Sequence, residues 1–194
     1  MIFNILISGV GGQGTVLASK LIAGAAIKCG YDVRTTETIG MAQRGGSVVG
    51  HTRIGDNIPS PLILPGGADL LIAFEPSEAV RQLSYLSENG TLIVCDNGVV
   101  PLTYALTQQI YEPEKLIDYI KSNVKNAIIV PGQPIISKYA KMLNVALLGV
   151  AAQSGIFPFE TGALRSVISE MPKFVEENLA AFEIGRNIYN EQLN

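Results

Sequence analysis

The sequence predicts an α/β domain with three layers, a mostly parallel but partly mixed sheet and a helical C-terminal third. Short apolar runs alternate with helical patterns through the first two thirds of the chain, as in a sheet covered by crossover helices. A glycine-rich turn joins the first run to the first helical pattern, and the pattern is helical from residue 134 onward. The chain has 194 residues, of which 47% are hydrophobic and 16% charged. These values favour one compact domain over 1–194.

The chain begins with an apolar strand and its crossover helix. Residues 2–8 are predicted as a buried parallel strand, and 14–29 place apolar residues at helical spacing. Gly30 is predicted to end this helix, because glycine readily adopts the left-handed conformation that follows many helices. A short second strand is predicted over 31–36.

The turn between the first strand and helix contains the fingerprint G-x-G-x-x-G, formed by Gly9, Gly11 and Gly14. Strand, tight turn and helix in this order are the context of a Rossmann-like dinucleotide site. Glycine allows positive φ and the close approach of a ligand, and the N–H groups at the start of the helix can bind a phosphate. The second interpretation is that these glycines only permit a tight turn and close packing of the helix on the strand.

A second glycine-rich loop, M-A-Q-R-G-G at 41–46, has neither a helical nor a strand period. Its Arg44, together with Arg53, makes the region locally basic, which suits phosphate groups or the carboxylates of a partner. The alternative for both residues is a solvated arginine. No lysine stands in the first loop, so the phosphate loop of a nucleotide triphosphatase is not predicted. The candidate cofactor-binding or partner-facing residues are Gly9, Gly11, Gly12, Gln13, Gly14, Thr15 and Arg44.

The middle of the chain is predicted to add an antiparallel part to the sheet. Residues 47–54 alternate between two faces, as a half-buried strand does, and 55–57 form a turn signal. The segment 61–64 is predicted to return as the hairpin partner of that strand. The prolines around it confine this partner to an edge of the sheet.

Further strands and helices alternate up to residue 130. The predicted strands are 70–74, 91–95 and 127–130, with a turn at 89–90 and a connection at 99–112. The predicted helices are 75–86 and 113–122, followed by C-terminal helices with breaks near Asn144, at 155–159 and at 171–172, the last one running from 173 to 191.

Polar residues at predicted strand ends are the other candidates for a site. Ligands of such sheets lie beyond the carboxyl ends of the strands, and Glu37, Glu75 and Asp96 are placed there. Glu37 is either a ribose-binding carboxylate or a solvated loop residue, and the other two are either general acids or caps. His51, the only histidine, is predicted to be structural or on the surface rather than catalytic. No catalytic residue and no set of metal ligands is predicted.

Charge and cysteine content argue against several classes of protein. A net charge of -3 gives no reason to expect nucleic acid or an acidic membrane surface as partner, and no apolar run approaches the roughly 20 residues of a membrane-spanning helix. The first apolar run is predicted to be a strand and not a signal peptide. Cys29 and Cys95 are predicted to be buried free thiols, which indicates a reducing compartment, the cytoplasm. Two cysteines cannot ligate an ordinary iron–sulfur cluster.

Three stretches together resemble the gamma-type subunit or domain of 2-oxoacid:ferredoxin oxidoreductases. They are I-S-G-V-G-G-Q-G-T-V-L-A-S-K-L-I-A-G-A-A at 7–26, T-E-T-I-G-M-A-Q-R-G-G-S-V-V-G-H-T-R-I-G at 36–55 and D-L-L-I-A-F-E-P-S-E-A-V-R at 69–81. The resemblance covers essentially the whole chain, and G-x-G-G-Q-G combined with Q-R-G-G is far more specific than a lone glycine fingerprint. The M-A-Q-R-G-G-S-V-V-G-H form and the helical C-terminal third are most similar to the beta subunits of indolepyruvate ferredoxin oxidoreductases.

The resemblance implies oxidative decarboxylation of a 2-oxoacid to an acyl-CoA, with electrons passed to ferredoxin. The family's cofactors are thiamine diphosphate and iron–sulfur clusters, but this sequence has neither the G-D-G opening of a thiamine-diphosphate motif nor cluster cysteines. The resemblance therefore implies an assisting subunit, inactive alone, whose larger alpha partner carries both cofactors, with coenzyme A as co-substrate. The glycine turn and the 41–46 loop are expected to face that partner and to shape the approach of coenzyme A or the 2-oxoacid.

Two other interpretations remain open. One is a free-standing NAD(P)- or flavin-dependent reductase that uses the G-x-G-x-x-G turn directly, although no catalytic pair on a predicted substrate-facing helix supports it. The other is a binding module whose pocket is vestigial and whose role is assembly. The apolar faces of the C-terminal helices are also compatible with self-association of the isolated chain.

Overall fold

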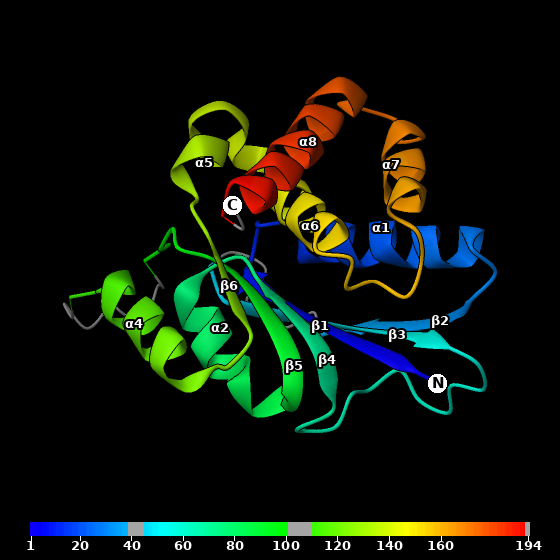
Figure 1. The fold of residues 1–194 in the computed structure, drawn as a ribbon, viewed down its shortest axis with the longest axis horizontal. Helices are drawn as coiled ribbons and strands as arrows, with labels where there is room; N and C mark the ends of the chain where they lie inside the picture. Colours follow the sequence, from blue (N-terminus) through cyan, green and yellow to red (C-terminus); the bar gives the residue numbers. More distant parts are fainter. Residues whose placement is uncertain (39–44, 101–109, 193–194) are drawn as a thin grey trace.

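The computed structural model describes residues 1–38, 45–100 and 110–192, and the strands within them form one mixed sheet (Figure 1). The strands are β1 (Phe3–Val10), β2 (Asp32–Glu37), β3 (Ser47–Gly55), β4 (Ala68–Ala73), β5 (Leu86–Cys95) and β6 (Ala127–Val130). Their order across the sheet is β2-β3-β1-β4-β5-β6. Strands β1, β4, β5 and β6 run parallel, whereas β3 is antiparallel to its neighbours β1 and β2. The predicted mixed sheet is confirmed.

Helices cover both faces of this sheet and give the predicted three layers (Figure 1). They are α1 (Thr15–Lys28), α2 (Pro76–Gln82), α4 (Pro113–Asn123), α5 (Gln133–Tyr139), α6 (Leu143–Gln153), α7 (Thr161–Ser169) and α8 (Val175–Gln192), with short 3₁₀ turns η1 (Leu83–Tyr85) and η2 (Ala140–Met142). One face of the sheet packs against α1 and the C-terminal helices, and the other packs against α2 and α4. The α/β class and the helical C-terminal third are therefore confirmed.

Strand β1 lies near the middle of the sheet, and both of its faces are covered. Ile5 and Ile7 belong to the core on the α1 side, and Leu6 belongs to the core on the α2 side. All three side chains have no exposed surface. Each such burial stabilises the fold by about 1.5–3 kcal/mol, which explains why this strand is apolar without alternation.

The predicted hairpin between β3 and 61–64 is wrong. The partners of β3 are β1 and β2, and 61–64 is irregular. Side chains of β3 instead form hydrogen bonds with the backbone at and just before 61–64. Ile63 N donates to His51 Nδ1 at 3.2 Å, and Arg53 Nη1 donates to Ser60 O at 2.8 Å. The prolines in this segment lack the N–H groups that a strand ladder needs, so side chains of β3 replace the ladder.

Further boundaries differ from the prediction. The helix predicted over 75–86 ends at Gln82, and Leu86 already belongs to β5. The expected turn at 89–90 lies inside β5, where Gly90 lets the strands approach: a Cβ there would lie 2.7 Å from Ala68 O. The helix break expected near Asn144 falls at η2, and Asn144 lies in the first turn of α6. The stop at Gly30, with φ of 85°, is confirmed. The predicted connection at 99–112 lies largely outside the described residues.

Helix α6 is the centre of the C-terminal layer. Its residues 143–152 are all buried, and it lies between the sheet and α8. The segment Gln133–Gln153 is long and apolar enough by composition to cross a membrane, but 61% of its most apolar window is buried inside the molecule. The buried part of this segment is α6, which is a core helix of the fold.

Candidate functional site

The candidate site lies where the chain leaves neighbouring strands toward opposite faces of the sheet. After β1 the chain continues into α1 on one face, and after β4 it continues into α2 on the other face. Strands β1 and β4 are parallel neighbours, so their carboxyl ends form a topological switch point. In open α/β sheets the ligand crevice lies at such a point. The glycine turn lies on one side of this switch point and 74–76 on the other, so these two segments are the walls of the crevice that the topology predicts.

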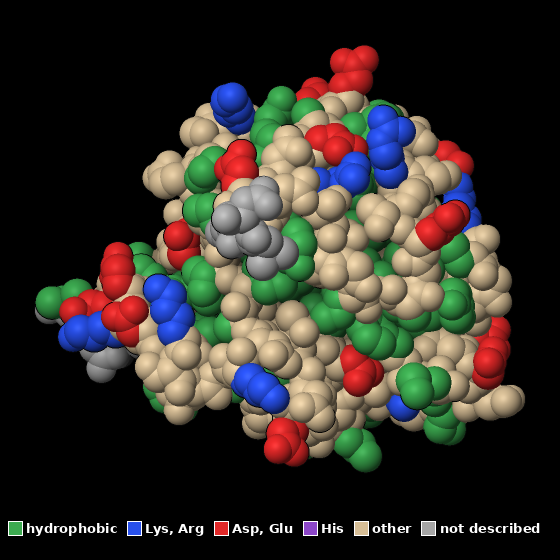
Figure 2. Space-filling view, in the orientation of Figure 1, with side chains coloured by type: hydrophobic (Ala, Val, Ile, Leu, Met, Phe, Trp, Pro, Cys, Tyr) green, Lys and Arg blue, Asp and Glu red, His purple; other side chains and the backbone are tan. Residues whose placement is uncertain are grey.

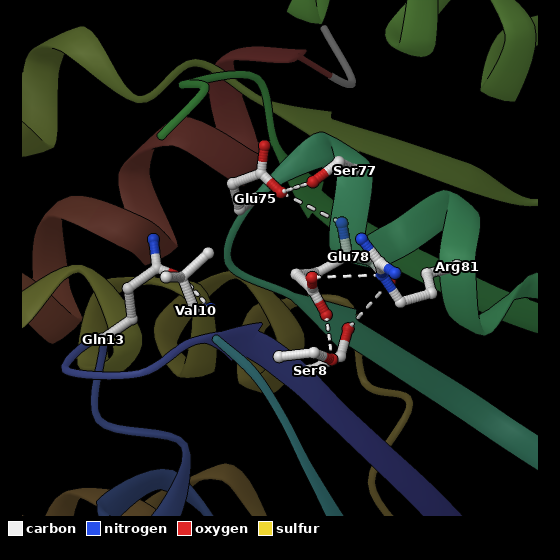
Figure 3. Close-up of polar contacts among 8 residues, drawn as sticks. Ser8, Val10, Gln13, Glu75, Ser77, Glu78 and Arg81 are labelled. Atoms are coloured by element: carbon white, nitrogen blue, oxygen red, sulfur yellow. Dashed lines mark hydrogen bonds and ion pairs between the residues drawn. The ribbon is translucent and has the colours of Figure 1, made fainter. Parts of the chain in front are cut away.

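Gln13 joins the two walls. Its Oε1 accepts a hydrogen bond from Val10 N at 2.7 Å (Figure 3). Its Nε2 donates to Phe74 O over a long 3.4 Å. Its own backbone N donates to Val10 O at 3.0 Å, and Gly11 N donates to Gly46 O at 2.8 Å. The glycine turn is thus tied to the start of β3 and to the end of β4.

Asn144 supports the turn from α6. Its Nδ2 donates to Gly14 O at 3.1 Å, and its buried Oδ1 has no hydrogen-bond partner among the residues that the structure describes. Gly12 and Gly14 have positive φ of 102° and 82°, which only glycine adopts without strain. Helix α1 begins without a side-chain cap, and Thr15 is buried. Sequence reasoning missed Asn144, because no local pattern indicates a contact across 130 residues.

The second wall carries a buried carboxyl, Glu75, at the predicted strand end. Its Oε2 accepts from Ser77 Oγ at 2.5 Å and from Glu78 N at 3.0 Å, so it caps α2. Its buried Oε1 has no hydrogen-bond partner within the described part of the chain, and Figure 3 shows this oxygen pointing away from Ser77 and Glu78. Burial raises the pKa of Glu75, and the hydrogen bonds from Ser77 and Glu78 oppose this shift. Of the two roles predicted for Glu75, the structure shows the cap.

Glu75→Gln is expected to gain stability relative to wild type as the pH rises. The folded-state pKa of Glu75 is raised, so the stability that its protonated form contributes is complete below the unfolded pKa and is lost as pH rises through the folded pKa. The difference in unfolding free energy between Glu75→Gln and wild type should change by at most about 1.4 kcal/mol per pH unit. Urea unfolding from pH 4 to 8 measures it, with the exposed Glu88→Gln as control. A difference that does not vary with pH would contradict the raised pKa.

A second buried carboxylate, Glu78, connects α2 with the strands. Ser47 Oγ donates to Glu78 Oε2 at 2.5 Å. Arg81 Nε lies 3.3 Å from Glu78 Oε1 (Figure 3). Ser8 Oγ donates to the Glu78 carbonyl at 3.3 Å. This cluster fixes the start of β3, directly after the second glycine-rich loop. Sequence reasoning missed it; the only signal was a glutamate spaced one helical turn before an arginine.

The other predicted residues have separate places. Burial lowers the pKa of His51, and the neutral ring accepts from Ile63 N, so its role is structural as predicted. Glu37 ends β2, an edge strand with β3 between it and β1. Arg44 lies outside the described residues. Cys29 is exposed at the end of α1, so its predicted burial is wrong.

Cys95 and Asp96 lie at the carboxyl end of β5. Cys95 is buried as predicted, and burial raises its pKa to about 12, which makes it an unreactive thiol. Asp96 Oδ1 accepts from Gly132 N at 2.7 Å. An open groove of about 550 Å³ lies beside it, between α4 and the start of α5. Among the described residues no group of three or more ligating side chains could hold a metal ion.

The fold and the site define a Rossmann-like α/β protein whose glycine turn is held by hydrogen bonds from side chains of the same chain, those of Gln13 and Asn144. The chain belongs to the pyruvate ferredoxin/flavodoxin oxidoreductase family, whose sequence pattern matches residues 4–188. The resemblance inferred from the glycine motifs is thereby confirmed.

Similar proteins extend over nearly the whole chain. Four of those found are named indolepyruvate oxidoreductase subunit IorB. The one from Archaeoglobus fulgidus is 38% identical over 96% of this chain and 95% of its own, and the one from Pyrococcus horikoshii is 33% identical over 99% and 98%. The gamma subunit of a keto/oxoacid ferredoxin oxidoreductase from Geobacter sulfurreducens has the same fold, with a TM-score of 0.66, 23% identity and coverage of 97% and 99%.

Proposed function

We propose that this chain is the non-cofactor-bearing subunit of a ferredoxin-dependent oxidoreductase that oxidatively decarboxylates indolepyruvate or related arylpyruvates to acyl-CoA. The observation that carries the proposal is the full-length similarity, at 33–38% identity, to two chains named indolepyruvate oxidoreductase subunits. The alternative of a free-standing NAD(P)- or flavin-dependent reductase is not favoured by any of these relatives.

The proposal places the redox chemistry on a larger partner subunit. Thiamine diphosphate and the iron–sulfur clusters would be bound there. This chain has only two cysteines for a cluster, and they lie apart, one directly after α1 and one in β5. Coenzyme A would be a co-substrate, ferredoxin the electron acceptor and the cytoplasm the location of the complex. Charge supports a protein partner rather than a nucleic acid: on the face in Figure 2, Lys and Arg side chains are scattered among Asp and Glu.

The glycine turn is the part of this chain that we place against the partner, beside the entrance to its active site. Several hydrogen bonds hold it in one shape. Gln13 is hydrogen-bonded to Val10 and Phe74. Asn144 is hydrogen-bonded to Gly14, and Gly11 to Gly46. A surface that is already ordered costs little entropy when it associates. Arg44, in the adjoining loop, is proposed to meet phosphate groups of coenzyme A or carboxylates of the partner.

Co-expression with a candidate thiamine-diphosphate and iron–sulfur alpha subunit tests the proposal. The assay is coenzyme A-dependent reduction of ferredoxin or a viologen dye, with indolepyruvate, phenylpyruvate and pyruvate compared. We expect activity only when both chains are present, and a higher kcat/KM for the arylpyruvates. Equal activity of the partner alone, or failure of the chains to associate, would overturn the subunit assignment. A preference for pyruvate would overturn only the substrate assignment.

A further inference from the structure

Three backbone donors of the glycine turn are used within the chain. In a dinucleotide site such N–H groups are free to bind the pyrophosphate. Here Val10 N donates to the side chain of Gln13, and Gly11 N donates to Gly46 O. The backbone N of Gln13 donates to Val10 O. A phosphate group that used these three N–H groups would have to break these bonds, and each released acceptor would need a new donor.

The space that the fingerprint glycines create is also filled from within. A Cβ on Gly9 would lie 2.9 Å from Gln13 Oε1 and 3.0 Å from Phe74 Cδ2. A Cβ on Gly14 would lie 2.5 Å from Asn144 Nδ2. Side chains of the protein itself therefore occupy the space beside these two glycines. In a dinucleotide site, by contrast, glycines of this motif make room for the ligand's pyrophosphate.

We propose that Gln13 is a specificity-determining residue whose side-chain amide is a built-in occupant of the β1–β4 crevice and closes it to dinucleotides and other phosphoanhydrides. The amide supplies both an acceptor and a donor. Its oxygen accepts a hydrogen bond from Val10 N at the end of β1, and its nitrogen donates one to Phe74 O after the end of β4. A pyrophosphate has only acceptors, so it could replace the first bond but not the second. This proposal does not depend on the partner subunit and holds for the isolated chain.

Removing the amide should open the crevice to anions. In Gln13→Ala the N–H of Val10 is freed and the volume of the amide becomes vacant. We expect ADP-ribose, used as a pyrophosphate probe in isothermal titration calorimetry, to bind Gln13→Ala about tenfold or more tightly than wild type, since one hydrogen bond to a charged group has that effect. Acetamide, which matches the deleted group, should compete with ADP-ribose for the variant. A merely structural role for Gln13 would not produce this competition.

Gln153→Ala is the matched control. Its amide also joins two partners, accepting from Arg186 Nε at 2.9 Å and donating to Asn190 Oδ1 at 3.0 Å, but it does so between α6 and α8. We expect ADP-ribose affinity equal to wild type. Equal affinity of wild type and Gln13→Ala, or no binding by either, would overturn the proposal. If Gln13→Ala does not fold, Gln13→Asn takes its place. Micromolar binding of ADP-ribose by wild type would overturn the proposal by itself.

Discussion

Gly185→Ala is expected to destabilise the protein by about 3 kcal/mol or more, at the upper end of what overpacking a core produces. Gly185 lies where α8 crosses α6, and a Cβ there would fall onto the carbonyl oxygen of Ala146. It would also lie 2.8 Å from the Ala146 carbonyl carbon and 3.1 Å from Val150 N. These are backbone atoms of a buried helix, so no side-chain rotation can relieve the overlap. The two helices would have to separate, and the contacts between them would be lost.

The opposite side of the crossing gives a second variant and a control. A Cβ on Gly149 would fall onto the Phe182 carbonyl oxygen and lie 3.0 Å from its carbon, so Gly149→Ala should be similarly destabilising. Gly162→Ala in α7 meets nothing within 4 Å and should change stability by less than about 1 kcal/mol. Denaturant unfolding of the three variants measures these differences. A Gly185→Ala protein as stable as Gly162→Ala would show that the helices do not cross this closely.

Gly14→Ala is expected to cost about 2–4 kcal/mol, from left-handed strain and from a steric clash combined. Its φ of 82° alone accounts for about 1–2 kcal/mol. The remainder arises because the new Cβ would lie 2.5 Å from Asn144 Nδ2, and Asn144 is buried and bonded to Gly14 O. Unfolding free energies of the single and double variants with Asn144→Ala form the test.

The double-mutant cycle separates the two contributions. In the Asn144→Ala background the clash is absent, so the cost of Gly14→Ala should fall to about 1–2 kcal/mol. Gly12→Ala is the matched control, because Gly12 also has positive φ but a Cβ there meets nothing within 4 Å. It should cost the same about 1–2 kcal/mol in either background. Strictly additive costs at Gly14 and Asn144 would contradict the contact between them.

Much of the fold was predictable because its signals are local. Buried strands such as β1 are continuous apolar runs, and Gly30 ends α1 at the expected residue. The predicted hairpin at 61–64 was wrong for a non-local reason. Backbone groups at and just before this segment, Ile63 N and Ser60 O, form hydrogen bonds with the side chains of His51 and Arg53 instead of with a strand. Alternation in β3 indicated a strand correctly, but alternation carries no information about which neighbours a strand pairs with.

The candidate site was predictable only in part. The glycine turn and Glu75 were placed at strand ends by their sequence context, and the structure brings both to the β1–β4 switch point. Asn144 and Glu78 were missed, because each acts across a distance in sequence that no motif spans. The resemblance to an oxidoreductase family came from motifs and agrees with the family match over 4–188.

The sequence by itself determined the α/β class, the positions of most elements and the family, because propensity, periodicity and motifs are properties of neighbouring residues. Only the tertiary structure decided what occupies the glycine turn. The fingerprint G-x-G-x-x-G specifies a backbone shape, and that shape can accept either a ligand or a side chain of the protein. In this chain Gln13 fills it from within, and Asn144 supports it from a helix that begins more than a hundred residues later.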